Sequence, residues 1–167
     1  MRLSLFRTEP YASAEPLYAA IVGEARQPHW YREAGVPDTL DGRFSVLTTL
    51  LALADLRLER GGGEARALGP RLAEAFIADM DAQMRQTGFG DPSLGKQVRM
   101  MVGSLAAKVD RWRGAVDSDE PWDEAVRASL HGEFAREQVQ AAVAAAQGWW
   151  RRLLGTEDAA MLEGRIA

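Results

Sequence analysis

The segment 91–116 constrains the fold most, because its apolar side chains recur in steps of three and four. That spacing places them along one face of an α-helix, whereas a half-buried strand would alternate apolar and polar residues. Asp91 and Pro92 suit the N-cap and the first position of this helix. The apolar stripe comprises Leu94, Val98, Met101, Val102, Leu105, Val109, Trp112 and Val116. A stripe of this length requires other apolar helices to cover it.

The rest of the chain has the same helical periodicity, interrupted by turn-forming residues. Valine and isoleucine are sparse, and no segment shows sustained alternation between hairpin turns. The sequence therefore predicts an all-α protein, a single compact domain of about six to eight helices. The predicted helices span residues 13–25, 41–60, 68–86, 91–116, 122–130 and 133–154, with a short helix after 156.

The run Asp-Ser-Asp-Glu-Pro at 117–121 is typical of a linker followed by a new helix start. We therefore predict an N-terminal arm at 1–13, a helical core at 14–116 and a C-terminal helical extension at 122–167. The extension is expected to form a helical hairpin that either packs on the core or contacts a partner.

Composition disfavours several classes of protein. The chain has 167 residues, a formal net charge of -4 and no cysteine. Disulfides and thiolate sites are therefore excluded, and dedicated binding of double-stranded nucleic acid is disfavoured. No apolar run approaches the roughly 20 residues of a membrane-spanning helix, and the amino terminus lacks the apolar region of a signal peptide. We expect a cytoplasmic protein, with peripheral contact at most to the inner membrane.

The common catalytic and metal-binding motifs are missing. The two histidines, His29 and His131, lie outside the spacings of helical metal sites. Asp79 and Asp81 form the most conspicuous acidic pair, but side chains two residues apart on a helix diverge. We expect these aspartates to pair with an arginine or to cap a neighbouring helix. The sequence therefore predicts that the protein is not an enzyme and that it has no catalytic residue, metal or cofactor.

The basic residues of the 91–116 helix have two interpretations. They form either a patch for RNA phosphates, anionic lipid or an acidic partner, or the solvated back of an amphipathic helix. These residues are Lys96, Arg99, Lys108, Arg111 and Arg113.

The run Trp-Trp-Arg-Arg at 149–152 also has two interpretations. Tryptophans beside arginines are typical of membrane interfaces and binding hot spots, but Trp150 also continues a core stripe, from which Trp149 diverges. Four methionines near Gly88 are similarly ambiguous. They would form a client groove if exposed and ordinary core if buried. They are Met80, Met84, Met100 and Met101.

Several short motifs occur in a fixed order within about residues 14–116. They are Leu17-Tyr18-x-x-Ile21-Val22, Ala25-Arg26-x-Pro28-x-Trp30-Tyr31, Gly35-Val36-Pro37-Asp38-Thr39-x-x-Gly42-Arg43-Phe44, Asp79-Met80-Asp81, Arg85, Gly88-Phe89-Gly90-Asp91 and Lys96-x-Val98. This ordered set resembles the ubiquinol–cytochrome c chaperone family, in an α-proteobacterial-type form.

The resemblance implies a non-enzymatic assembly chaperone. Mitochondrial members hold newly made cytochrome b for the bc1 complex, act with a small partner protein and associate with the ribosome. By resemblance, this chain is expected to bind cytochrome b, or another unassembled membrane subunit, at the cytoplasmic face of the inner membrane.

The residues expected to bind a partner are Trp30, Tyr31, Arg43, Met84, Phe89, Lys96, Arg99, Met100, Trp149 and Arg152. Asp38, Asp79 and Asp81 are expected to act as structural clasps. In particular, we predict a buried Asp38–Arg43 ion pair that anchors the turn at Pro37.

Two other functions remain open. One is a small helical enzyme that uses Asp79, Asp81, Arg43 and Lys96 on a phosphorylated substrate. The other is a peripheral membrane or RNA adaptor that uses the basic helix and the tryptophan pair. A deep polar pocket lined by Asp79, Asp81 and Lys96 would favour the enzyme, whereas an apolar groove or patch would favour the chaperone.

Overall fold

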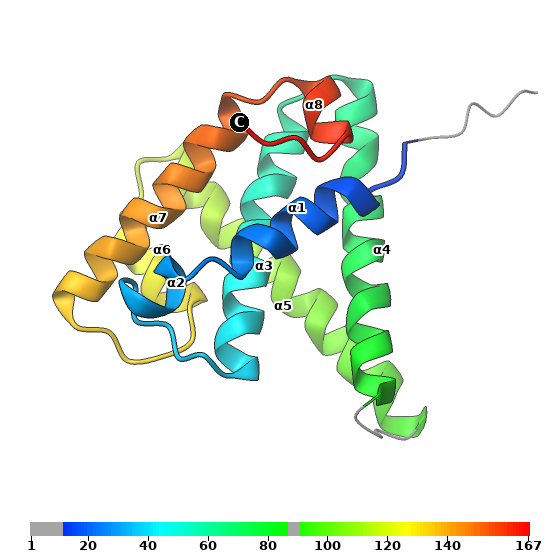
Figure 1. Cartoon of the computed structure of the whole chain (residues 1–167). Helices are drawn as coiled ribbons and strands as arrows, with labels where there is room; N and C mark the ends of the chain where they lie inside the picture. Colours follow the sequence, from blue (N-terminus) through cyan, green and yellow to red (C-terminus); the bar gives the residue numbers. More distant parts are fainter. Residues whose placement is uncertain (1–11, 87–90) are drawn as a thin grey trace, which may run out of the picture.

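The computed structural model describes residues 12–86 and 91–167, which contain eight α-helices and no strand (Figure 1). This architecture confirms the all-α prediction. The helices are α1 (Glu15–Ala25), α2 (His29–Arg32), α3 (Leu40–Glu59), α4 (Gly63–Gln86), α5 (Asp91–Asp117), α6 (Trp122–Ser129), α7 (Arg136–Leu154) and α8 (Asp158–Leu162).

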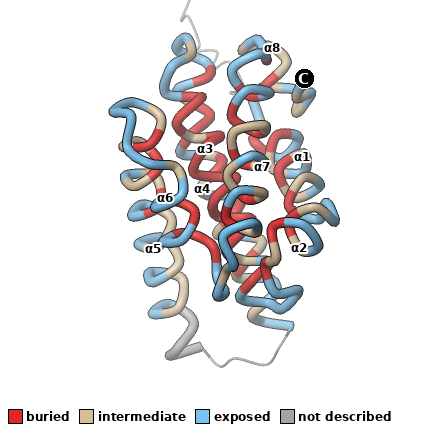
Figure 2. Tube along the Cα trace, turned by 90° about the vertical axis from the view of Figure 1, so that its left-hand side faces the viewer, coloured by how far each residue is buried: buried red, intermediate tan, exposed pale blue. Residues whose placement is uncertain are grey.

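Helix α3 lies at the centre of the molecule, in contact with α1, α4, α5, α6 and α7. Its run Leu50–Ala54 is apolar all round, which is typical of a helix enclosed on every side. The buried hydroxyls of Thr48 and Thr49 donate to the helix's own backbone carbonyls, so they do not need water. Figure 2 shows this buried centre in red, with exposed backbone around it.

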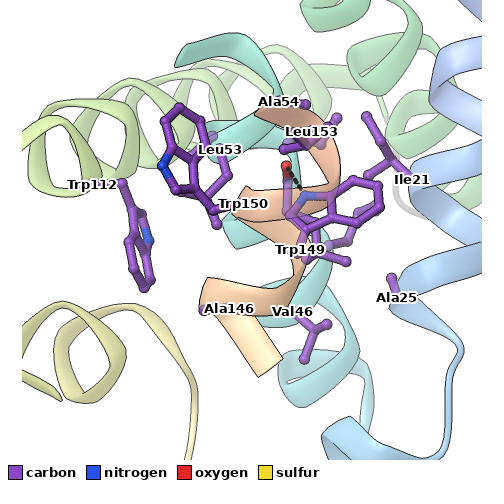
Figure 3. Packing of buried hydrophobic residues seen from close by; sticks show 14 of the residues in the cluster. Ile21, Ala25, Val46, Leu53, Ala54, Trp112, Ala146, Trp149, Trp150 and Leu153 are labelled. Atoms are coloured by element: carbon purple, nitrogen blue, oxygen red, sulfur yellow. Dashed lines mark hydrogen bonds between the residues drawn. The ribbon is translucent and has the colours of Figure 1, made fainter. Parts of the chain in front are cut away.

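Both tryptophans of α7 are buried (Figure 3). Trp149 lies toward Ile21 and Ala25 of α1 and donates from Nε1 to the Leu50 carbonyl at 3.3 Å. Trp150 lies on the other side, toward Trp112 of α5. The C-terminal extension therefore packs on the core, because its long helix is covered from two directions.

Arg57 joins α3 to the turn between α7 and α8. Its guanidinium donates to the carbonyl oxygens of Leu153 at 3.0 Å and Thr156 at 2.6 Å, and it pairs with Asp158 at 2.9 Å. Asp158 also accepts the Gly62 backbone N–H at 2.8 Å. The Leu153 carbonyl also accepts the Thr156 backbone N–H at 3.2 Å, whereas Arg57 is the donor that the described residues provide for the Thr156 carbonyl. We call this network the Arg57 clasp.

Helix α4 begins at Gly63, five residues before its predicted start at 68. Ala65 and Leu68 are buried, so packing stabilises the additional turn. Pro70 lies inside the helix but is exposed, where water can solvate the carbonyl that loses its N–H partner.

Candidate functional site

The hairpin of α4 and α5 carries four of the ten predicted partner-binding residues and projects from the body at the lower right of Figure 1. On α4 the buried stripe ends in the half-buried Met84. On α5 no side chain between Gly95 and Ala107 is buried, and from Gly95 onward Lys108 is the first that is. We call residues 81–86 and 95–107 the outer hairpin segment; it is the least enclosed part of these helices (Figure 2).

Three predicted partner-binding residues are exposed on the outer hairpin segment. They are Lys96, Arg99 and Met100, and Met100 is 60% exposed. Of the other methionines, Met80 is buried, whereas Met84 and Met101 are half-buried. Phe89, a further predicted contact, lies outside the described residues. The methionines therefore do not form one continuous groove, but Met100 offers a soft apolar side chain close to two cations.

The opposite side of α5 carries a second exposed apolar residue, Val102, at 42% exposure. Two positions along a helix correspond to about 200° of rotation, so Val102 and Met100 face different directions. Val102 lines a cavity of about 200 Å³ enclosed by α3, α4 and α5. Its lining comprises Leu51, Asp55, Gly69, Leu72, Ala73, Val102, Leu105, Ala106 and Val109. We call this cavity the three-helix pocket.

Asp55 is the one charged residue in the lining of the three-helix pocket. Burial raises the pKa of its carboxyl group, and the nearby Glu59 raises it further, while Arg113 opposes both. A Cβ atom at Gly69 would lie 2.8 Å from Asp55 Oδ1, so the glycine leaves room for the carboxylate beside α4. No described residue donates a hydrogen bond to Asp55.

A larger open groove of about 830 Å³ lies between α7 and the segment that joins α5 to α6. Its lining mixes apolar side chains such as Trp122 and Val143 with charges of both signs, such as Glu120 and Arg136. None of its charged residues was predicted to bind a partner.

Lys108 is buried, which fits neither interpretation of the basic residues, since the patch and the solvated helix back both place it at the surface. Its Nζ donates to the Ser45 carbonyl at 3.2 Å and to the Thr48 hydroxyl, and lies 5.9 Å from the centre of the Phe44 ring. Burial, reinforced by the charge of Arg111, lowers the pKa of Lys108 to about 8. The residue faces α3 because it shares a helical face with the buried Trp112.

Two further members of the predicted patch are engaged within the fold. Arg113 forms an ion pair with Glu59 at 2.5 Å, and Arg111 donates to the Ser129 hydroxyl at 3.5 Å. The predicted basic patch is therefore reduced to Lys96 and Arg99 at the exposed end of the hairpin.

Trp30 and Trp149 are core residues, at 0% and 2% exposure, so a surface contact with a partner does not fit them. The sequence alone did not show which face of each of their helices packs against the core. Trp30 Nε1 donates to Glu24 at 3.4 Å, which ties α2 to α1. Arg152 is exposed and pairs with the same Glu24 at 2.8 Å. The half-buried Tyr31 donates its hydroxyl to the Ala25 carbonyl at 2.7 Å.

The predicted Asp38–Arg43 pair is present at 2.6 Å, but it is exposed rather than buried. The turn at Pro37 lies at the surface, so both side chains reach into solvent. The hydrogen bond from Arg43 lowers the pKa of the Asp38 carboxyl. Exposed pairs of this kind are solvated and screened by salt, so they contribute little to stability, and this pair is a weak clasp.

Asp79 and Asp81 point to different neighbours, as their spacing predicts. Asp79 accepts a 2.5 Å hydrogen bond from the Tyr18 hydroxyl of α1, and Asp81 pairs with Arg85 one turn away at 3.0 Å. Burial, together with the bond to Asp79, raises the pKa of Tyr18. Neither aspartate lines the three-helix pocket or the larger groove, and neither does Lys96.

Metal-binding groups and membrane-spanning helices bear on the other possible functions. Within that part of the chain, no group of three or more histidine, aspartate or glutamate side chains is placed to hold a metal ion. Among the described helices, none combines the length and apolar character needed to cross a membrane.

Asp55, Gly69 and Arg57 were not singled out in the sequence, although each leaves a signal there. Asp55 and Arg57 interrupt an otherwise apolar helix, where a charged residue needs a partner or a purpose. Gly69 stands inside a helix, where glycine is unfavourable unless space requires it.

A helical domain with an open hairpin and an apolar pocket, and with its acidic residues scattered, has the features of a binding protein. The model of the ubiquinol-cytochrome C chaperone family matches residues 32–166. The chain therefore belongs to this family. The match includes the predicted linker and nearly all of the C-terminal extension.

The fold is also similar to a solved structure, the crystal structure of the Cbp3 homolog from Brucella abortus. The TM-score is 0.77 at 25% sequence identity, and the match covers 92% of this chain and 87% of that chain. No curated protein matches the sequence significantly.

Proposed function

We propose that this protein is a non-enzymatic assembly chaperone that binds newly made cytochrome b during biogenesis of the ubiquinol–cytochrome c reductase (bc1) complex. Family membership over residues 32–166 is the observation that carries the proposal. Asp79, Asp81 and Lys96 line neither the three-helix pocket nor the larger groove, so neither of these two cavities supports the alternative enzyme.

The outer hairpin segment is the surface that we assign to the client. An unassembled membrane segment presents apolar side chains flanked by charges, and a flexible methionine adapts to varied apolar shapes. Met100 supplies such a side chain, while Lys96 and Arg99 supply nearby positive charge. Binding at this place leaves the buried core undisturbed, because α5 contributes no buried side chain between residues 95 and 107.

We place this activity at the cytoplasmic face of the inner membrane, where cytochrome b is inserted. Two exposed cations near the hairpin end favour contact with anionic lipid headgroups, worth about 1 kcal/mol for each cation close to the surface. The mitochondrial relatives also suggest a small partner protein and the ribosome as further contacts.

Deletion of the gene tests the proposal. We expect loss of the b-type haem absorbance and of bc1 activity from membranes, both restored by the wild-type gene. Complementation with Arg99→Glu should restore them only in part, whereas Arg32→Glu, an exposed arginine on α2, should restore them fully. Normal cytochrome b levels in the deletion strain would refute the chaperone assignment.

A further inference from the structure

The three-helix pocket places one carboxylate against apolar walls. Leu51, Leu72 and Val109 come from three different helices, and Asp55 lies among them with no hydrogen-bond donor from the described residues. A half-buried charge without a partner costs free energy. The fold also accepts a glycine in the interior of α4 at 69, where a Cβ would press on this carboxylate. Packing within the fold does not explain why the protein keeps an unpaired carboxylate at Asp55 and a glycine inside α4 beside it.

None of the charged groups around the pocket is hydrogen-bonded to Asp55 as a counter-ion. On its own helix the nearest is Glu59, which is also negative. On α5 the nearest is Arg113, but both of its terminal nitrogens are hydrogen-bonded to Glu59, at 2.5 and 3.0 Å. The lining contributed by α4 is Gly69, Leu72 and Ala73, which carry no charge.

We propose that the three-helix pocket receives one basic side chain, arginine or lysine, of the client protein, with Asp55 as its acceptor; this inference rests on the proposed chaperone function. The apolar walls fit the methylene stem of such a side chain, and the carboxylate fits its cationic head. The volume of about 200 Å³ is below the roughly 300–1,000 Å³ of pockets for drug-sized ligands. It suits a single long side chain rather than a helix or a cofactor.

The position of the pocket supports this occupant. Val102 and Ala106 at its mouth are exposed and uncharged, so a side chain can enter without displacing an ion pair. The pocket adjoins the outer hairpin segment through Val102, on the other side of α5 from Met100, so a client that extends around this helix would reach its mouth. One specific ionic contact would fix the position of the client on a surface that is otherwise largely apolar and adaptable.

A small-molecule titration tests the chemistry of the pocket without any client. Full-length protein is titrated with n-butylguanidinium and, as a neutral mimic of the same shape, with n-butylurea, while NMR follows the backbone amides. We expect saturable shifts at Asp55, Gly69 and Val102 with the guanidinium alone, and their loss in Asp55→Asn. Equal shifts with both compounds, or none with either, would overturn the proposal.

Co-purification of cytochrome b tests the client. Asp55→Asn should reduce the amount recovered by about tenfold, as expected for a hydrogen-bonded charge, and should leave the melting temperature equal or higher, since an unpaired buried charge is removed. Ala106→Trp, which covers the mouth but keeps the carboxylate, should reduce recovery similarly. Glu74→Gln, an equal charge change at an exposed site on α4, is the control.

Undiminished recovery with Asp55→Asn, or a marked fall in its melting temperature, would show that Asp55 is structural and end the proposal. If cytochrome b proves not to be the client, the deletion strain reveals it independently, and the guanidinium titration still decides whether the pocket binds a cation.

Discussion

The Arg57 clasp and the outer hairpin segment lie in the same domain but differ in solvent exposure. The clasp buries its polar and apolar groups, whereas the outer hairpin segment exposes them. At the clasp, a buried arginine satisfies two carbonyls and a carboxylate, and Met161 beside it on α8 is fully buried. On the outer hairpin segment, Met100 is largely exposed and its cationic neighbours reach into solvent.

This difference suggests that the clasp mainly contributes stability and that the outer hairpin segment mainly contributes binding. A turn closed by hydrogen bonds to backbone carbonyls holds one geometry, because each group left unpaired would cost free energy. A helix with no buried side chain over three turns loses few packed contacts when it opens locally, so the free energy of its local opening is lower. We therefore expect substitutions at the clasp to change folding, and substitutions on the outer hairpin segment to change binding.

The largest effect of losing a polar contact is expected from Arg57→Ala. It leaves the Thr156 carbonyl without a donor and removes the side-chain donor of the Leu153 carbonyl, so the free energy of unfolding should fall by about 1–3 kcal/mol, as measured by urea denaturation. Arg57→Lys keeps the charge but loses the planar fork, so its loss should be smaller. A loss below about 1 kcal/mol for the alanine variant would mean that the clasp is no more than a surface ion pair.

Lys108 marks the boundary between the two regions, because it is the first buried residue of α5 among residues 95–117, whose side chains the structure describes. Because its pKa is lowered to about 8, the folded state holds fewer protons than the unfolded state between about pH 8 and the ordinary lysine range. Stability contributed by this residue therefore rises with pH across that window and is lowest below it.

Replacement of Lys108 by methionine should remove this dependence. We expect Lys108→Met to be more stable than wild type at pH 7, and its advantage to shrink by roughly 2 kcal/mol between pH 8 and 10.5. Paired urea titrations across this range check it, since all other groups titrate in both proteins. Parallel pH profiles would show that Lys108 is well solvated in the folded state.

The helices were predictable because their signals are local. The pair Asp91-Pro92 opens α5, the pair Glu120-Pro121 directly precedes α6, and the apolar run of α3 correctly indicated a buried helix. The start of α4 was placed five residues too late, because the glycines before it are usually terminators. Only the packing of Ala65 against the core stabilises a helix there.

The candidate site was less predictable, because it depends on which helices become neighbours. Trp149 and Lys108 both lie where the sequence allowed an exposed side chain, and both are buried by a helix distant in sequence. The pocket around Asp55 is likewise assembled from three helices, and no periodicity within one of them encodes it. Met100 and Lys96 were predictable as surface residues because α5 receives no cover at that end.

The smallest effect on folding, and the sharpest test of the comparison, comes from one substitution made in both regions. Met100→Ala should change the free energy of unfolding by less than about 0.5 kcal/mol, yet lower the recovery of cytochrome b with the tagged protein. Met161→Ala removes the same side chain from a fully buried site, so it should cost about 2–5 kcal/mol. Its recovery of cytochrome b should match wild type at temperatures where it remains folded. If Met100→Ala unfolds as readily as Met161→Ala, the outer hairpin segment belongs to the core, and its exposed methionine is not reserved for a client.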